Sequence, residues 1–92
     1  MLDLNDVYVL NDNFILRSIH DKFWCLDTNS GDQYRLNRVA YDILSELHPN
    51  QPISVAISNV SSKYKIAKDV FERDAIELLS SAIKSNIIRK EV

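Results

Sequence analysis

The chain has 92 residues, 46% of them hydrophobic and 26% charged, with a formal net charge of −2. This length supports one globular domain, and there is no apolar run near the ~20 residues of a membrane-spanning helix. The single cysteine, Cys25, excludes an internal disulfide and favours a reducing, cytoplasmic location.

The first part of the chain predicts strands. Residues 1–6 are polar, and we expect them to be frayed. Alternating apolar and polar residues, bounded by turn-forming residues, predict strands at about residues 14–19, 22–27 and 33–36. The loops between these strands are short, so we expect an antiparallel meander.

From Asn37 onwards the apolar residues recur at helical spacing. The pattern predicts helices at about residues 37–47, 54–64 and 67–85. Asn37 is a suitable N-cap for the first helix and Ser54 for the second. Asn86 is placed where a left-handed residue ends the third.

The expected fold class is α+β. We expect residues 1–92 to form a single winged-helix-like domain, in which a three-stranded antiparallel sheet is followed by three helices. The sequence shows no internal repeat and no interdomain linker.

Residues able to catalyse a reaction are sparse. His20 and His48 lie in predicted turns, and Cys25 lies in a predicted strand, so we expect neither a nucleophilic triad nor a four-ligand zinc site. The acidic pairs on the third helix are interleaved with bases, which is typical of a solvated face. We therefore expect a binding protein rather than an enzyme, with no catalytic residue, cofactor or metal ion.

An ordered set of short motifs runs from Phe14 to Ile88. The motifs are Cys25-Leu26-Asp27, Gly31, Gln33-Tyr34-Arg35-Leu36-Asn37, Ile43-Leu44, Val55-Ala56-Ile57 with Tyr64, Asp69-Val70 and Ser85-Asn86-Ile87-Ile88. Together they resemble the PqqD-like family, the small winged-helix domains called precursor recognition elements of ribosomally synthesised and post-translationally modified peptides (RiPPs). The sequence departs from the family at Asn86, where glycine is usual, and in its closing isoleucines. Asparagine tolerates the left-handed conformation, so the fold is not in doubt.

The resemblance implies a non-catalytic adaptor, or peptide chaperone, that holds the leader segment of a precursor peptide during RiPP biosynthesis. With an amino-terminal segment such as Tyr8-Val9-Leu10-Asn11, the chain is most similar to the stand-alone leader-binding proteins of lasso-peptide clusters. The partners implied there are a cysteine-protease-like leader peptidase and an ATP-dependent macrocyclase. Within the family, the alternative partner is a radical-SAM maturase, as in pyrroloquinoline quinone biosynthesis.

The expected binding site is an edge of the sheet. An edge strand at residues 33–36 exposes unpaired N–H and C=O groups, which an extended peptide satisfies by adding a strand. The third helix runs beside this strand in such a fold and supplies the other wall of a groove. The predicted leader-binding residues are Gln33, Tyr34, Arg35 and Leu36 on the strand, and Val70, Arg73, Asp74 and Glu77 on the helix.

Other interpretations stay open at this point. Each predicted site residue can instead have a plain surface or core role. A winged helix can bind nucleic acid, although the net charge of −2 and the mixed charges of the third helix argue against it. A small subunit that completes a larger enzyme is a further possibility. We expect no nucleic-acid or membrane partner, and either a monomer or a dimer paired through the free edge.

Overall fold

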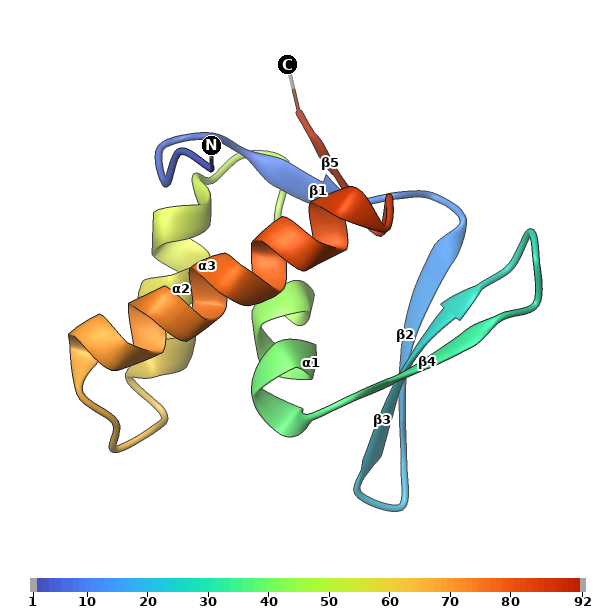
Figure 1. Cartoon of the computed structure of the whole chain (residues 1–92), viewed down its shortest axis with the longest axis horizontal. Coiled ribbons are helices and arrows are strands. Elements are labelled where there is room, and N and C mark those ends of the chain that lie inside the picture. The colour runs from blue at the N-terminus through green and yellow to red at the C-terminus, as the bar shows by residue number, and fades with distance from the viewer. Residues whose placement is uncertain (1, 92) are drawn as a thin grey trace.

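The structure is a computed structural model that describes residues 2–91. It confirms the predicted α+β architecture, with a three-stranded antiparallel sheet and three helices (Figure 1). A second, two-stranded sheet joins the two ends of the chain. The elements are β1 (Tyr8–Leu10), β2 (Phe14–Ile19), β3 (Lys22–Asp27), β4 (Gln33–Leu36), α1 (Arg38–Ser45), α2 (Ile53–Ser61), α3 (Lys68–Lys84) and β5 (Ile88–Lys90).

The three-stranded sheet has the order β2-β3-β4. His20 and Asp21 join β2 to β3 with positive φ angles of 50° and 64°, the pattern of a two-residue type I′ hairpin turn. The loop between β3 and β4 is held by Asp27, whose side chain accepts hydrogen bonds from Asn13 Nδ2 at 3.1 Å and from the Asn29 N–H at 2.9 Å. The two turns connect neighbouring antiparallel strands, and the order β2-β3-β4 leaves β4 at an edge of the sheet.

The core lies between the helices and one face of the sheet. Asn37 caps α1 as predicted, because its Oδ1 accepts a hydrogen bond from the Ala40 N–H at 2.7 Å. α3 crosses the other two helices (Figure 1), and its apolar stripe supplies a large part of the core. The buried residues of α3 are Phe71, Ala75, Leu79 and Ala82.

The amino-terminal segment, predicted to be frayed, contacts the start of α2 in the part that the structure describes. The Leu4 C=O accepts a hydrogen bond from the Ser54 N–H at 3.1 Å, and the Asp6 C=O accepts one from the Ile53 N–H at 3.0 Å. A helix N-terminus has unsatisfied N–H groups, and here this segment supplies their acceptors. Ser54 is therefore not the cap of α2, which follows Pro52 without a side-chain cap. Residue 1 lies outside the described residues.

The small sheet of β1 and β5 was not predicted. The strands are antiparallel, with Tyr8 opposite Lys90 and Leu10 opposite Ile88. Asn86 has the expected positive φ, 59°, and ends α3. The chain then reverses, so that Ile88 is buried in the core at 2% exposure while it pairs with β1.

Candidate functional site

β4 is bonded to the sheet on one side only, and its hydrogen-bonding pattern follows from the neighbouring loop. The Asp27 N–H donates to the Asp32 C=O at 2.9 Å, so these residues form a hydrogen-bonded pair. Bonded and non-bonded pairs alternate along an antiparallel ladder. The next bonded pairs in the register are therefore Cys25/Tyr34 and Phe23/Leu36.

The intervening residues of β4, Gln33 and Arg35, consequently turn their N–H and C=O groups away from β3. Within residues 2–91, no hydrogen bond engages these groups on the open side. The edge thus offers alternating donors and acceptors to an extended chain, as the sequence predicts for this strand.

A cavity of about 190 Å³ opens where β4 runs into α1. This volume is below the roughly 300–1,000 Å³ of sites for whole small molecules, and suits a single amino-acid side chain. The lining is mostly apolar, and Asp74 is its one charged residue. The lining residues are Asn37, Val39, Ala40, Ile43, Ile66, Phe71, Asp74, Ala75 and Leu78.

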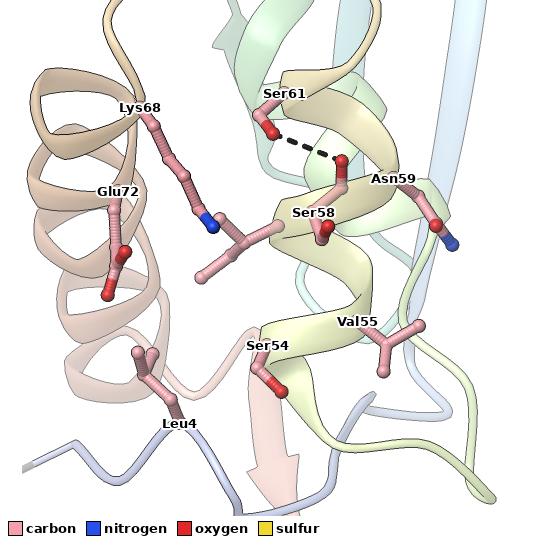
Figure 2. A pocket seen from close by; sticks show the side chains of 9 residues that line it. Leu4, Ser54, Val55, Ser58, Asn59, Ser61, Lys68 and Glu72 are labelled. Carbon is pink, nitrogen blue, oxygen red and sulfur yellow. Dashed lines mark hydrogen bonds between the residues drawn. The ribbon is translucent and has the colours of Figure 1, made fainter.

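A larger hollow of about 470 Å³ lies between α2, α3 and the amino-terminal segment (Figure 2). Ser54 and Ser58 line it from α2, Lys68 and Glu72 from α3, and Leu4 from the amino-terminal segment. Neither this hollow nor the smaller cavity is lined by a residue of a strand. The smaller cavity is the better candidate, because it begins at Asn37, the residue that follows the unpaired edge of β4.

The predicted residues of β4 divide between two faces of the sheet. Tyr34 is 40% exposed, and its ring lies 6.5 Å from that of Phe14. Leu36 packs against the core. Gln33 and Arg35 are exposed on the opposite face, where the Arg35 guanidinium lies 5.2 Å from the centre of the Trp24 ring.

The predicted residues of α3 are also divided. Asp74 lines the cavity, whereas Val70 and Glu77 are not among its lining residues. Arg73, in contrast, lines a shallow depression on another part of the helix surface, together with Asp69, Glu72 and Ile76. Of the four predicted α3 residues, the structure therefore brings Asp74 to the cavity.

Sequence reasoning missed the contribution of α1 and the loop before α3. Val39 and Ala40 line the cavity from the first turn of α1, and Ile66 lines it from the loop. Ile66 is 46% exposed. A large apolar residue in the polar segment Ser61–Ala67 is a signal that could have identified this part of the wall.

The titratable groups with shifted pKa values do not form a reactive centre. Burial raises the pKa of the Cys25 thiol, and the nearby charge of Asp27 raises it further. Burial also raises the pKa of Tyr64, whose hydroxyl donates to Asp42 Oδ2 at 2.6 Å. Both shifts keep these groups protonated, so they are unsuited to act as nucleophiles near neutral pH.

Within residues 2–91, no group of three or more His, Cys, Asp or Glu side chains is arranged to hold a metal ion. None of the helices in this part of the chain has the length and apolar character needed to cross a membrane.

Comparison with known proteins supplies a family and a fold. The family model described as "Coenzyme PQQ synthesis protein D (PqqD)" matches residues 25–88. A structure described as "TbiB1 in Complex with the TbiA(beta) Leader Peptide" is 18% identical and has a TM-score of 0.74, with 88% of this chain and 94% of that chain covered. Another, "Lasso peptide synthetase B1 complexed with the leader peptide", is 21% identical with a TM-score of 0.68, covering 89% and 96%. At such identities the likeness establishes the shared fold. No curated protein matches this chain significantly.

Proposed function

The chain belongs to the PqqD family, and from this premise we propose that it binds the leader peptide of a RiPP precursor by strand addition at β4. The whole chain acts as one recognition domain and performs no catalysis itself. The observation that carries the proposal is the unpaired backbone of Gln33 and Arg35 beside a cavity of side-chain size.

Backbone pairing supplies part of the affinity. Gln33 and Arg35 each offer one donor and one acceptor on the open side, and each hydrogen bond contributes about 0.5–1.5 kcal/mol net. Their sum is roughly 2–6 kcal/mol, whereas a Kd of 1 μM corresponds to about −8.2 kcal/mol. Association also costs translational and side-chain entropy. Side-chain burial must therefore contribute, and it also supplies the sequence specificity that backbone bonds lack.

The cavity is the first place where a peptide side chain is buried. It adjoins the end of β4, and the lining residues Val39, Phe71 and Leu78 give it an apolar surface. Tyr34 adds exposed aromatic area on the same face of the sheet as the core. An extended peptide places alternate side chains on one face, so every second residue of the leader contacts this wall.

The bound leader is presented to a maturation enzyme. The two similar structures are complexes with leader peptides, and one of them is described as a lasso peptide synthetase B1. We favour a lasso-peptide pathway on this basis, with a leader peptidase as the enzyme served and a macrocyclase acting later. A radical-SAM maturase is the alternative partner, consistent with the description of the family.

An NMR titration tests the proposal. Leader peptides synthesised from precursor genes next to the gene of this chain are added to ¹⁵N-labelled protein. We expect micromolar or tighter binding, with the largest amide shifts at residues 33–36 and around Asp74. Absence of binding, or shifts confined to the opposite edge strand β2, would contradict strand addition at β4.

A further inference from the structure

The three-stranded sheet has one face that packs against the helices and one that does not. All three helices lie on the same side of the sheet (Figure 1), where Phe14 and Cys25 are buried at 6% and 0% exposure. Side chains alternate along each strand, so the residues in the other register point away from the helices, and none of them is buried. This outer face comprises Ile15, Arg17 and Ile19 of β2, Lys22, Trp24 and Leu26 of β3, and Gln33 and Arg35 of β4.

The outer face is flat and partly apolar. Ile15 and Ile19 are 41% and 50% exposed, and they are two of the five exposed large hydrophobic residues within residues 2–91. Trp24 stands on the central strand, opposite Arg17 of β2 and Arg35 of β4. No residue of the outer face lines any of the three hollows described above. Sites for small molecules are concave, so a flat apolar face of this kind suits a protein surface.

The charge of the outer face is positive, although the chain has a net charge of −2. Its charged residues are Arg17, Lys22 and Arg35, and all three are exposed. None of the ion pairs within residues 2–91 includes them. Three positive charges therefore surround the apolar centre of the face.

The acidic residues next to the outer face lie in the loops at its ends. Asp21 is in the turn between β2 and β3, and Asp32 immediately precedes β4. Asp27 belongs to the opposite face, because it is paired with the buried Phe14. Positive charges remain in excess when both loop carboxylates are included. Complementary charge thus favours a partner with an acidic surface.

Other occupants match this face less well. Two outer faces packed about a two-fold axis would bring like charges together, and docking on another part of a second copy would give an open-ended contact unless a ring closed. Three bases are few beside the roughly six to ten phosphate contacts of a typical nucleic-acid-binding protein. On an anionic membrane each base contributes only about 1 kcal/mol, and the net negative charge of the chain opposes that attraction.

We propose, on the basis of the function proposed above, that the outer face docks the leader peptidase, through a surface whose apolar centre is surrounded by aspartate and glutamate. A leader strand added at β4 extends the sheet, and its alternate side chains continue the outer face. A protein that rests on this face therefore reaches the bound leader. Tryptophan and arginine dominate the binding energy of many interfaces, so Trp24 between Arg17 and Arg35 is the expected centre of the contact.

Calorimetry with the leader peptidase encoded beside this chain tests the docking. The peptidase is titrated into three leader-saturated proteins: the wild type, the double variant R17E/K22E and the control K63E/K68E. The control makes the same change of net charge at two exposed residues, one in the loop before α3 and the other at its start. Circular dichroism checks that all three are folded, and a leader titration checks that each still binds the leader.

We expect the Kd for the peptidase to rise about tenfold or more with R17E/K22E and less than twofold with K63E/K68E. Raising NaCl from about 0.05 to 0.5 M should weaken docking to the wild type. In the ¹⁵N-labelled wild type carrying the leader, unlabelled peptidase should shift the amide resonances of Ile15 and Arg17 and the indole N–H resonance of Trp24.

The outcomes separate this inference from the proposed function. Absence of peptidase binding, equal Kd values for the two double variants, or shifts confined to the helices would overturn the docking. Leader-induced shifts at residues 33–36 would still support strand addition in each of these cases. Vesicles of phosphatidylglycerol or poly(U) RNA that bind the wild type but not R17E/K22E, while the peptidase does not bind, would assign the outer face to that ligand instead. If the leader leaves residues 33–36 unshifted, strand addition at β4 is itself wrong.

Discussion

The sheet has two open edges, β2 and β4, and both have unpaired backbone groups. The Thr28 N–H donates to the Asn13 C=O at 2.7 Å. By the same alternation as in β4, Leu16 and Ser18 of β2 turn their N–H and C=O groups outward. β2 has six residues and β4 has four. Judged by the backbone alone, β2 is the longer template for an added strand.

The difference between the edges lies in their surroundings. No residue of β2 or of β4 itself lines any of the three hollows, but Asn37, the residue that follows β4, lines the cavity of about 190 Å³. Unpaired groups determine where a strand can be added, and pockets for side chains determine where a particular peptide binds. The comparison therefore favours β4, and matched substitutions on the two edges can test it.

Arg35→Pro should have the largest effect on leader binding. Proline removes the outward N–H of β4, so a carbonyl group of the bound leader loses its hydrogen-bond donor. We expect a loss of affinity of about tenfold or more, equivalent to about 1.4 kcal/mol, measured by calorimetry. Ser18→Pro removes an outward N–H from β2 and should change the affinity less than twofold. If both variants are folded and lose leader affinity equally, the leader does not prefer β4 to β2.

Val39→Phe should have the next largest effect. Val39 lines the cavity beside β4, and a larger side chain there occupies the space for the apolar residue of the peptide. If the peptide loses the burial of at least one methylene, worth about 0.8 kcal/mol, the affinity should fall by about fourfold or more. Val55→Phe is the matched control, because Val55 is 37% exposed and lines the larger hollow. If the two variants bind the leader equally well, the cavity is not a subsite.

Arg35→Gln separates the side chain of Arg35 from its backbone. The contact with the Trp24 ring at 5.2 Å is a cation–π interaction worth about 0.5–1 kcal/mol at an exposed site. We expect a decrease of that size in the free energy of unfolding by urea, followed by fluorescence of Trp24, the only tryptophan. Leader affinity should stay within about twofold of the wild type, because the edge N–H is retained. A tenfold loss would assign binding to the guanidinium instead.

The smallest effect concerns the loop that positions β4. Hydrogen bonds from the Asn13 side chain and the Asn29 N–H lower the pKa of Asp27 below its ordinary value of 3.8. A lowered pKa in the folded state means that the carboxylate stabilises the fold above about pH 3.8, and that this contribution is lost as the pH falls through the folded-state pKa. Asp27→Asn should flatten the acid limb of a stability–pH curve measured by thermal unfolding.

Asp32→Asn is the control for that measurement. Asp32 lies in the same loop, and within residues 2–91 its side chain forms no hydrogen bond. The acid limb of this variant should therefore follow that of the wild type. A curve for Asp27→Asn that keeps the same acid limb would show that the carboxylate does not stabilise the loop.

The features that depend on nearby residues were predictable from the order of the amino acids. The strand Gln33–Leu36, the cap at Asn37 and the left-handed residue Asn86 were all predicted, and the structure confirms them. Each of these features rests on side chains and backbone groups within about one turn or one loop of each other. Such short-range preferences are visible in the residue order without knowledge of distant partners.

The features that join distant segments depend on long-range packing and could not be predicted locally. β1 and β5 pair although they lie near opposite ends of the sequence. The N–H groups of Ile53 and Ser54 donate to carbonyl groups of the amino-terminal segment and not to a local cap. The cavity also required α1, α3 and the loop at Ile66 to pack together. Asp74 and the adjacent Arg73 line different hollows because successive helical residues point about 100° apart. The side of α3 that faces the cavity is set by packing against α1 and α2, which no local pattern specifies.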